Sequence, residues 1–307
     1  MSKNTVISDY NSSVTVFNEQ LLEKKYWLKL GVGLNIEKIS YNKELNLTQK
    51  SINIIKNNLK ILGYHHSRKP NFNSPIHDMK KIIKKVSDIG LPPVFSFVYD
   101  EFWYIQWQIK NALEEILGKN YKQLPDFWAW NVDQGKSGWQ PHRDKVGGSL
   151  FDNNEPKSVT VWIPLSVANP TNSCMYVLPA NKDKYYNKLK PSGGQISLPG
   201  SLADIKALPA DPGDLLIWTQ EVFHWGSSSL DNHNEESRIS IAYEFQRNDV
   251  KPFRDFLLDP NTLPTFDERL VLISMQILQY THMYGFKEDL VFWAQNCIER
   301  YKRINKL

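Results

Sequence analysis

The spacing of hydrophobic residues predicts helices towards both ends of the chain. Apolar side chains recur every three to four positions in residues 47–63 and 100–117, as on the buried face of an amphipathic helix. The same period returns in residues 266–285 and 288–305. Thr265 precedes the first of these C-terminal segments and is a suitable helix N-cap. The pattern therefore predicts helical flanks on both sides of the chain's middle.

Between these flanks, residues 126–245 have the pattern of a β domain. Short runs of β-branched and aromatic residues alternate there with clusters of Gly, Pro, Asn and Asp. The expected strands are FWAWNV, SVTVWIPLSV, CMYVLP, DLLIW and RISIAYEF. We therefore expect an α+β protein of one domain, 1–307, with a mainly β core. Its parts are a mainly helical flank (1–120), a β sandwich or barrel (121–250) and C-terminal helices (251–307).

Composition narrows the class of protein. A chain of 307 residues that is 41% hydrophobic can bury a full core. Its net charge of +4 comes from dispersed Lys and Arg, which does not predict a nucleic-acid partner. Cys174 and Cys297 lack the spacing of a disulfide framework or zinc ribbon, which favours the reducing cytoplasm. Neither a signal peptide nor a membrane-spanning run of about 20 apolar residues is evident.

A candidate metal site begins in GWQPHRDK. His142 and Asp144 are separated by one residue, so a strand would direct both side chains to one face. His224 follows in PGDLLIWTQEVFHWG, which is typical of a turn, a strand, a reversal and a second strand. Two imidazoles and one carboxylate leave three positions of an octahedral ion open, as in non-haem Fe(II) oxygenases. These residues are the candidate metal ligands and catalytic residues. A zinc hydrolase is the alternative, but its His-Glu-x-x-His signature is absent.

A candidate anion site follows in RISIAYEF. The period of two places Arg238 and Ser240 on one face, together with Ala242 and Glu244. A guanidinium that faces into a barrel needs a partner, because an uncompensated buried charge costs about 3–5 kcal/mol. A dicarboxylate ligand would supply one, bound by the fork of Arg238 and the hydroxyl of Ser240. A salt bridge with an internal Asp or Glu is the alternative interpretation.

Substrate contacts are harder to predict. Trp139 and Trp225 lie close in sequence to the proposed ligands and are candidates to line the pocket, although large aromatics more often fill cores. Asn131 is a further candidate. Arg143 lies beside the metal motif and, with the neighbouring Lys145, indicates an anionic small-molecule substrate; a solvated surface is the alternative.

Three segments together resemble a known family. GWQPHRD, SVTVWIPLSVANPTNSCMYVLPANK and GDLLIWTQEVFHWG are similar, in order and spacing, to the phytanoyl-CoA dioxygenase (PhyH)-like family of Fe(II)/2-oxoglutarate-dependent oxygenases. The resemblance implies a double-stranded β-helix, a jelly-roll or cupin-like fold. It also implies iron held by His142, Asp144 and His224, and 2-oxoglutarate held by Arg238 beside Ser240. Two segments depart from the family: ANPTNSC, where many members have Asn-Gly, and the long SSLDNHNEES before Arg238.

The resemblance also implies a reaction. With Fe(II), 2-oxoglutarate and O2, the protein would hydroxylate a C–H bond of a small polar or anionic metabolite, a sugar acid or a natural-product intermediate, releasing succinate and CO2. Members that halogenate carry a small residue in place of the acid, so the retained Asp144 favours hydroxylation. Desaturation, epimerisation and ring formation use the same triad and stay open as alternatives.

Two rivals belong to other classes. One is a barrel-fold binding protein that has lost turnover. The other is a phosphohydrolase built on His65, His66, His77 and Asp78, which lacks a second downstream acid.

Overall fold

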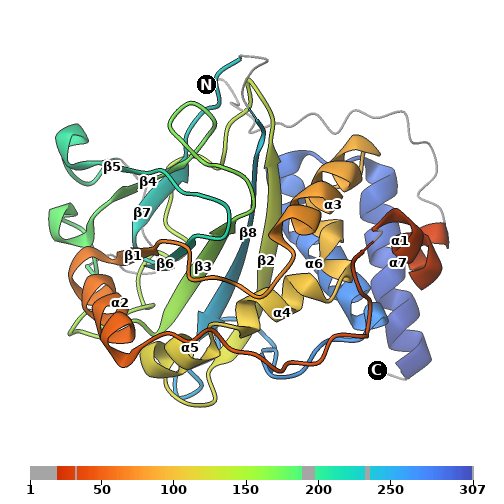
Figure 1. The fold of residues 1–307 in the computed structure, drawn as a ribbon, viewed down its shortest axis with the longest axis horizontal. Helices are drawn as coiled ribbons and strands as arrows, with labels where there is room; N and C mark the ends of the chain where they lie inside the picture. The colour runs from red at the N-terminus through yellow and green to blue at the C-terminus, as the bar shows by residue number, and fades with distance from the viewer. Residues whose placement is uncertain (1–18, 32, 189–197, 232–235, 306–307) are drawn as a thin grey trace.

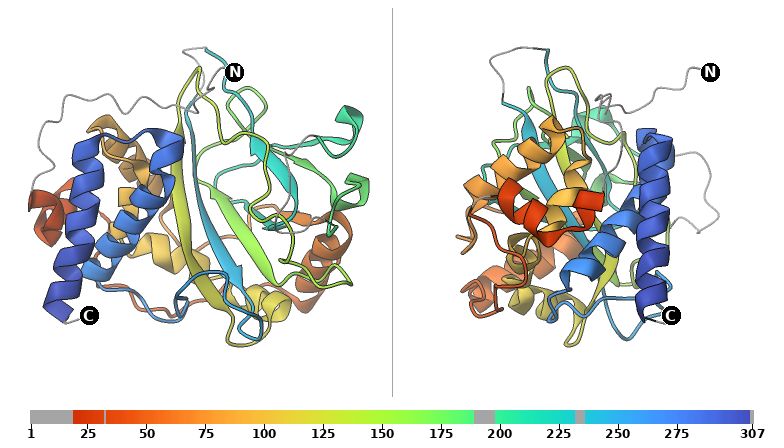
Figure 2. Two further views of the ribbon diagram at one scale, coloured as in Figure 1. Left: turned by 180° about the vertical axis from the view of Figure 1, so that it is seen from behind. Right: turned by 90° about the vertical axis from the view of Figure 1, so that its right-hand side faces the viewer.

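The computed structural model describes residues 19–31, 33–188, 198–231 and 236–305. In these residues two antiparallel sheets face each other, and helices cover the outer face of the larger sheet (Figure 1). The rear view in Figure 2 shows the same order of layers, with the long strands standing between the helices and the smaller sheet. This arrangement is the double-stranded β-helix with helical flanks that the sequence predicts.

The larger sheet has five strands in the order β1-β6-β3-β8-β2, and the smaller has the order β5-β4-β7. Their bounds are β1 Tyr64–Ser67, β2 Lys122–Val132, β3 Ser158–Pro164, β4 Met175–Leu178, β5 Lys206–Leu208, β6 Leu215–Thr219, β7 Phe223–Gly226 and β8 Arg238–Gln246. Every pairing between these strands is antiparallel. Strand β1 comes from the N-terminal flank, so the β domain recruits a segment from outside the range 121–250.

Two hydrophobic cores lie on opposite faces of the larger sheet. Alternate residues of β8, among them Ile239 and Ile241, pack with the helices in the larger core. Ala242 on the other face packs with residues of the smaller sheet in a second core. The period of two in RISIAYEF therefore directs Arg238, Ser240, Ala242 and Glu244 into the space between the two sheets.

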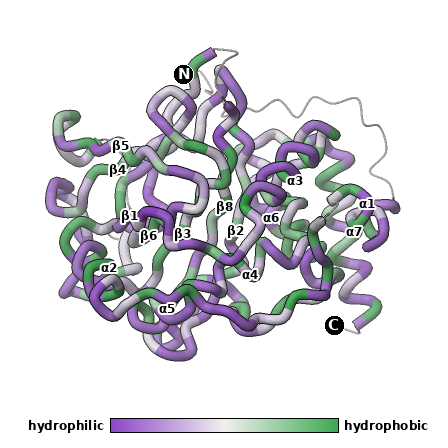
Figure 3. The backbone as a smooth tube through the Cα atoms, viewed as in Figure 1, coloured by the Kyte–Doolittle hydropathy of each residue, from purple (hydrophilic) through white to green (hydrophobic). Residues whose placement is uncertain are grey.

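The helices are α1 Lys24–Leu30, α2 Gln49–Leu62, α3 Ile76–Asp88, α4 Glu101–Trp107, α5 Lys110–Leu117, α6 Phe266–Tyr284 and α7 Glu288–Asn305. Single-turn 3-10 segments lie at Glu19–Leu22, Ala180–Lys182 and Leu202–Asp204, and a longer one, η2, spans Pro93–Val98. Along α2 and α7 hydrophobic and hydrophilic stretches alternate, as Figure 3 shows. None of the helices in the described ranges has the length and apolar character needed to cross a bilayer.

Three of the four predicted helices are confirmed as α2, α6 and α7. Thr265 caps α6 in a full capping box with Glu268, and Gly63 and Gly285 end their helices with positive φ. The fourth prediction, one helix over 100–117, is wrong. It is divided into α4 and α5 because the carbonyl of Gln108 accepts the N–H of Leu45 (2.7 Å) and is lost to the helix. Helix α3 was not predicted.

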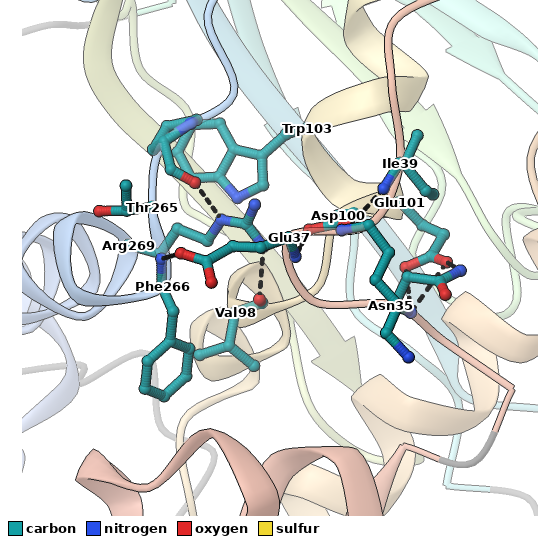
Figure 4. Close-up of polar contacts among 12 residues, drawn as sticks. Asn35, Glu37, Ile39, Val98, Asp100, Glu101, Trp103, Thr265, Phe266 and Arg269 are labelled. Atoms are coloured by element: carbon teal, nitrogen blue, oxygen red, sulfur yellow. Dashed lines mark hydrogen bonds and ion pairs between the residues drawn. The ribbon is translucent and has the colours of Figure 1, made fainter.

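A buried ion pair ties the N-terminal segment to the C-terminal helices. Asp100 accepts the backbone N–H groups of Glu37, Lys38 and Ile39 and forms an ion pair with Arg269 of α6 (2.7 Å), as Figure 4 shows. Segments far apart in the chain are thereby joined at one carboxylate, which holds the helical layer together behind the larger sheet.

Candidate metal centre

The two candidate histidines lie opposite each other across an antiparallel bridge. The N–H of His142 donates to the carbonyl of His224 (3.0 Å), and the N–H of His224 donates to the carbonyl of His142 (2.9 Å). Their ring centres are 4.4 Å apart. The segment that carries His142 and Asp144 is a loop with this single bridge to β7, so the expectation of a regular strand there is wrong. The side chains converge because the loop is held against β7.

Asp144 completes the set. Its Oδ1 lies 3.4 Å from Nε2 of His142 and 3.5 Å from Nε2 of His224. Its Oδ2 accepts hydrogen bonds from the Thr160 hydroxyl (2.6 Å) and the Trp218 indole N–H (2.9 Å). One ligand atom from each of the three residues lies within 4.8 Å of the others. With Oδ2 held by the protein, Oδ1 is left to face the two imidazoles.

Both imidazoles present Nε2 to the same point. Nδ1 of His142 donates to the carbonyl of Gln140 (2.6 Å), and Nδ1 of His224 donates to that of Val222 (3.0 Å). This assigns the proton to Nδ1 and the lone pair to Nε2 in each ring. Among the described residues, the buried Nε2 of His142 has no hydrogen-bond partner. A metal ion would supply that partner.

The protonation states of His224 and Asp144 also fit a metal, whereas Asp144 raises the pKa of His142 against the effect of burial. Burial lowers the pKa of His224 to about 4, so this imidazole is neutral at pH 7. Burial opposes ionisation of Asp144, but His224 and His142 hold the pKa of its carboxyl well below the usual range. Neutral imidazole and ionised carboxylate are the forms that bind a divalent cation.

Arg238 lies buried near this triad without an acidic partner. Its Nε donates to the carbonyl of Ser173 (3.0 Å), Nη1 to Ser240 Oγ (2.6 Å) and Nη2 to Ser173 Oγ (3.3 Å). No carboxylate in the described residues lies within ion-pair distance of it. The backbones of Gly138 and Gly226 cross beside it; a Cβ at Gly138 would lie 2.9 Å from Nη2 and 2.7 Å from Gly226 Cα. Both positions therefore require glycine.

One inner cavity joins the triad to Arg238. Aromatic side chains form much of its wall, and it includes Trp130, Trp139, Trp162, Trp218 and Tyr280. At the triad the cavity meets an outer groove of about 740 Å³, a size typical of small-molecule sites. The triad and Arg238 therefore border one continuous space, which opens at the triad into the groove.

The sequence comparisons agree with this geometry. A family model described as phytanoyl-CoA dioxygenase (PhyH) matches residues 60–240. The chain belongs to the PhyH family. Members of this family are Fe(II)/2-oxoglutarate-dependent enzymes, and the His-Asp-His cluster fits the iron that they use. No curated protein matches the chain.

Solved structures show a similar arrangement of elements. One is the non-heme alpha-ketoglutarate-dependent epimerase SnoN from nogalamycin biosynthesis (TM-score 0.48, 11% identity, 65% of this chain and 84% of that chain). Another is the carbocyclase SnoK from the same biosynthesis (TM-score 0.47, 13% identity, 68% and 87%). A third is HygX from Streptomyces hygroscopicus with nickel and 2-oxoglutarate bound (TM-score 0.46, 12% identity, 68% and 90%).

Within the PhyH fold, the predicted substrate residues separate into two groups. Trp139 lines both the cavity and the groove, and its ring stands edge-on to His142 (5.7 Å between ring centres). Trp225 stacks on Tyr176 and does not border the cavity or the groove. Asn131 alternates with Trp130 on β2 and lies on the face opposite the cavity.

Arg143 borders the groove but is buried and already paired. Its guanidinium forms an ion pair with Asp183 (2.6 Å) and donates to the carbonyl of Glu221. Lys145 lies over the ring of Phe253, 4.6 Å from its centre. The two cations that suggested an anionic substrate therefore have partners within the protein.

The rival histidine cluster does not form a metal site. His65 contacts Asn58 and Ser67, and His66 contacts Asp214 (3.0 Å). Among the described residues, the triad is the one group of three or more His, Cys, Asp or Glu with metal-binding geometry. The phosphohydrolase interpretation therefore has no structural support.

Several residues of the site could not be found from the sequence. Thr160 and Trp218 hold Asp144, and Ser173 holds Arg238. Ser173 lies in the unusual ANPTNSC turn at a positive φ of 75°, so the departure from the family pattern falls at the anion site. Glu244 was placed on the inward face but was given no role. Only strand register reveals these contacts, since Thr160 pairs with both Trp218 and Glu244.

Proposed function

We propose that the protein hydroxylates a C–H bond of a small polar metabolite or natural-product intermediate, with conversion of 2-oxoglutarate to succinate and CO2. The observation that carries the proposal is the convergence of His142, Asp144 and His224, near a buried guanidinium that has no acidic partner. In this proposal the three residues hold Fe(II) on one face, which leaves positions for co-substrate and O2.

Arg238 and Ser240 would hold the far carboxylate of 2-oxoglutarate. A bidentate guanidinium–carboxylate pair would neutralise the buried charge, and the Ser240 hydroxyl would add a hydrogen bond. When bound, the iron and its co-substrate supply the oxidising power that the side chains lack. The chain's own part is to orient the co-substrate and to exclude water with the aromatic wall.

Retention of Asp144 supports hydroxylation rather than halogenation, because the carboxylate occupies the place that a halide would need. Arg143 and Lys145 already have partners within the protein, so they no longer indicate an anionic substrate. The proposal is therefore limited to a polar substrate.

The test is a screen of candidate metabolites for substrate-stimulated succinate formation with Fe(II), 2-oxoglutarate and O2. Mass spectrometry of the product then distinguishes gain of one oxygen atom from loss of two hydrogens or from an isomer of unchanged mass. His142→Ala should abolish succinate formation. A protein that binds 2-oxoglutarate but never forms succinate with any compound would be a binding protein, and a product without added oxygen would identify a different oxidation.

A further inference from the structure

The inward face of β8 carries a basic side chain at one end and an acidic side chain at the other. Arg238 begins the strand and Glu244 lies six residues later on the same face, about 20 Å away at the rise of an extended strand. Both side chains border the inner cavity, and Glu244 also borders the outer groove. The co-substrate end and the groove end of the cavity are therefore marked by a cation and an acid.

The other two acids at the groove end are already engaged within the chain. Asp126 forms an ion pair with Arg254, whose Nε donates to it at 2.7 Å. Asp144 accepts hydrogen bonds from Thr160 and Trp218 and belongs to the metal triad.

Within the part of the chain that the structure describes, Glu244 has neither a cationic partner nor a place in the metal triad. One of its oxygens accepts a hydrogen bond from the side-chain amide of Gln220, which carries no charge. Among the described residues no Lys, Arg or His lies within ion-pair distance of it, because Lys145 is over Phe253 and Arg254 is bound to Asp126. Its second oxygen has no hydrogen-bond partner in the described chain. Like Arg238, Glu244 is therefore an ionisable group at the cavity without a counter-ion among the residues that the structure describes.

A second polar group lies on the same cavity wall. Tyr280 of α6 borders both the cavity and the groove, and its hydroxyl makes no hydrogen bond within the described residues. Its ring packs against Trp139, with 5.2 Å between ring centres, and this packing holds the hydroxyl in place. A ligand group with several N–H donors could use both the carboxyl of Glu244 and the hydroxyl of Tyr280.

We propose that Glu244 anchors the substrate and that the substrate carries an ammonium group, bound between Glu244 and Tyr280 on the groove side of the triad. The inference rests on the proposed function, because it needs a substrate that enters from the groove while 2-oxoglutarate occupies the Arg238 end.

The local charges agree with this assignment. Burial, with the nearby Asp126 and Asp144, raises the pKa of Glu244 well above its usual range, against the smaller opposing effect of Lys145 and Arg254. A cation placed beside the carboxyl would favour the ionised form and form a charge-assisted hydrogen bond. An anionic substrate group at this position would lie beside the carboxyl of Glu244 and near the carboxylate of Asp144.

The first test needs no ligand. We expect Glu244→Gln to leave the free energy of unfolding unchanged or raised, because the variant removes an unneutralised acid. Glu155→Gln, on an exposed acid paired with Lys60, is the matched surface control. A loss of stability in Glu244→Gln beyond that of the control would show that Glu244 is a structural acid and would overturn the proposal.

The second test measures binding and turnover with defined probes. The panel contains n-butylamine, putrescine, L-lysine and glucosamine, each with its N-acetylated counterpart, at concentrations up to 10 mM. We expect at least one amine to stimulate succinate formation and its acetylated form not to do so. Glu244→Gln should raise KM for that amine at least tenfold with a smaller change in kcat.

The outcomes separate this inference from the proposed function. Binding of 2-oxoglutarate to the Ni(II)-loaded protein, and its loss in Arg238→Met, tests the co-substrate site without any amine. If that binding is present, the Glu244 assignment fails when no amine has an effect, when amine and amide act alike, or when Glu244→Gln leaves KM unchanged. If 2-oxoglutarate does not bind, the proposed function itself fails.

Discussion

Two arginines of this protein are equally buried but have opposite surroundings. Arg269 is 0% exposed and Arg238 is 2% exposed. Arg269 forms an ion pair with Asp100 and donates to the carbonyls of Pro264 and Val98. Arg238 donates only to uncharged oxygens of Ser173 and Ser240. The first guanidinium is neutralised by the chain, and the second is not.

The difference shows how burial separates a structural charge from a binding site. Burial lowers the pKa of Arg238 to about 10, so the group still carries its charge at pH 7. A buried charge without a counter-ion is costly, and it is kept where a ligand completes the pair. Removing Arg269 should therefore damage the fold, whereas removing Arg238 should damage binding.

The largest expected effect is on stability. Arg269→Met leaves Asp100 buried without its cation and should lower the free energy of unfolding by about 3–5 kcal/mol. The measurement is urea denaturation followed by circular dichroism. The double variant Arg269→Met/Asp100→Asn should recover part of this loss, since the unpaired carboxylate is removed with its partner. An Arg269→Met protein as stable as wild type would break the comparison.

Arg238→Met should have the converse effect. We expect the free energy of unfolding to change little or to rise, and the affinity for 2-oxoglutarate to fall about 10- to 100-fold, as for loss of a charge-assisted hydrogen-bond pair. Calorimetric titration of the Ni(II)-loaded protein with 2-oxoglutarate measures the affinity. Arg238→Lys keeps the charge but not the forked guanidinium, and its affinity for 2-oxoglutarate should lie between those of wild type and Arg238→Met. Unchanged affinity in Arg238→Met would contradict the co-substrate assignment.

The two hydrogen bonds to Asp144 allow a third test, of how the protein positions this metal ligand. Thr160→Val and Trp218→Phe each remove one donor to Oδ2; the first keeps the size of the side chain, and the second replaces the indole by a smaller aromatic ring. Loss of a group that orients a metal ligand costs about 10- to 100-fold in metal affinity. Competition between Co(II) and a chelator should report this loss in both variants, and the free energy of unfolding of the apo-protein should change little in Thr160→Val. Wild-type Co(II) affinity in both variants would show that Asp144 is positioned without them.

The sequence was sufficient where the chemistry is local. His142 and Asp144 could be predicted because they lie two residues apart in one motif, and Arg238 because alternation along β8 directs it inwards. His224 lies eighty residues after Asp144, and its segment was found through its strand-reversal-strand pattern and the family resemblance. Contacts that depend on register could not be predicted, such as the row that places Thr160 between Trp218 and Glu244.

Contacts between distant segments also changed the helices that the hydrophobic period of the sequence predicts. The apolar period of residues 100–117 continues through Gln108, but the backbone of Leu45 takes the carbonyl of that residue and divides the helix. Likewise, the loop carrying His142 forms isolated bridges rather than a strand, and the metal site depends on the bridge between His142 and His224.

The smallest expected effect is a pH dependence that distinguishes the two arginines. Burial acts to raise the pKa of Asp100, but Arg269 and three backbone N–H groups hold it below the usual value. A carboxyl with a lowered folded-state pKa stabilises the protein above its unfolded pKa of about 3.9 and loses this contribution as pH falls through the folded value. The stability gap between wild type and Arg269→Met should therefore narrow, by on the order of 1 kcal/mol, between pH 5 and the acid limit of folding. The gap between wild type and Arg238→Met should stay constant over that range, because no described acid pairs with Arg238. Urea denaturation of the three proteins at a series of pH values measures both gaps. The same pH dependence in both gaps would mean that each buried arginine is neutralised by an acid of the chain.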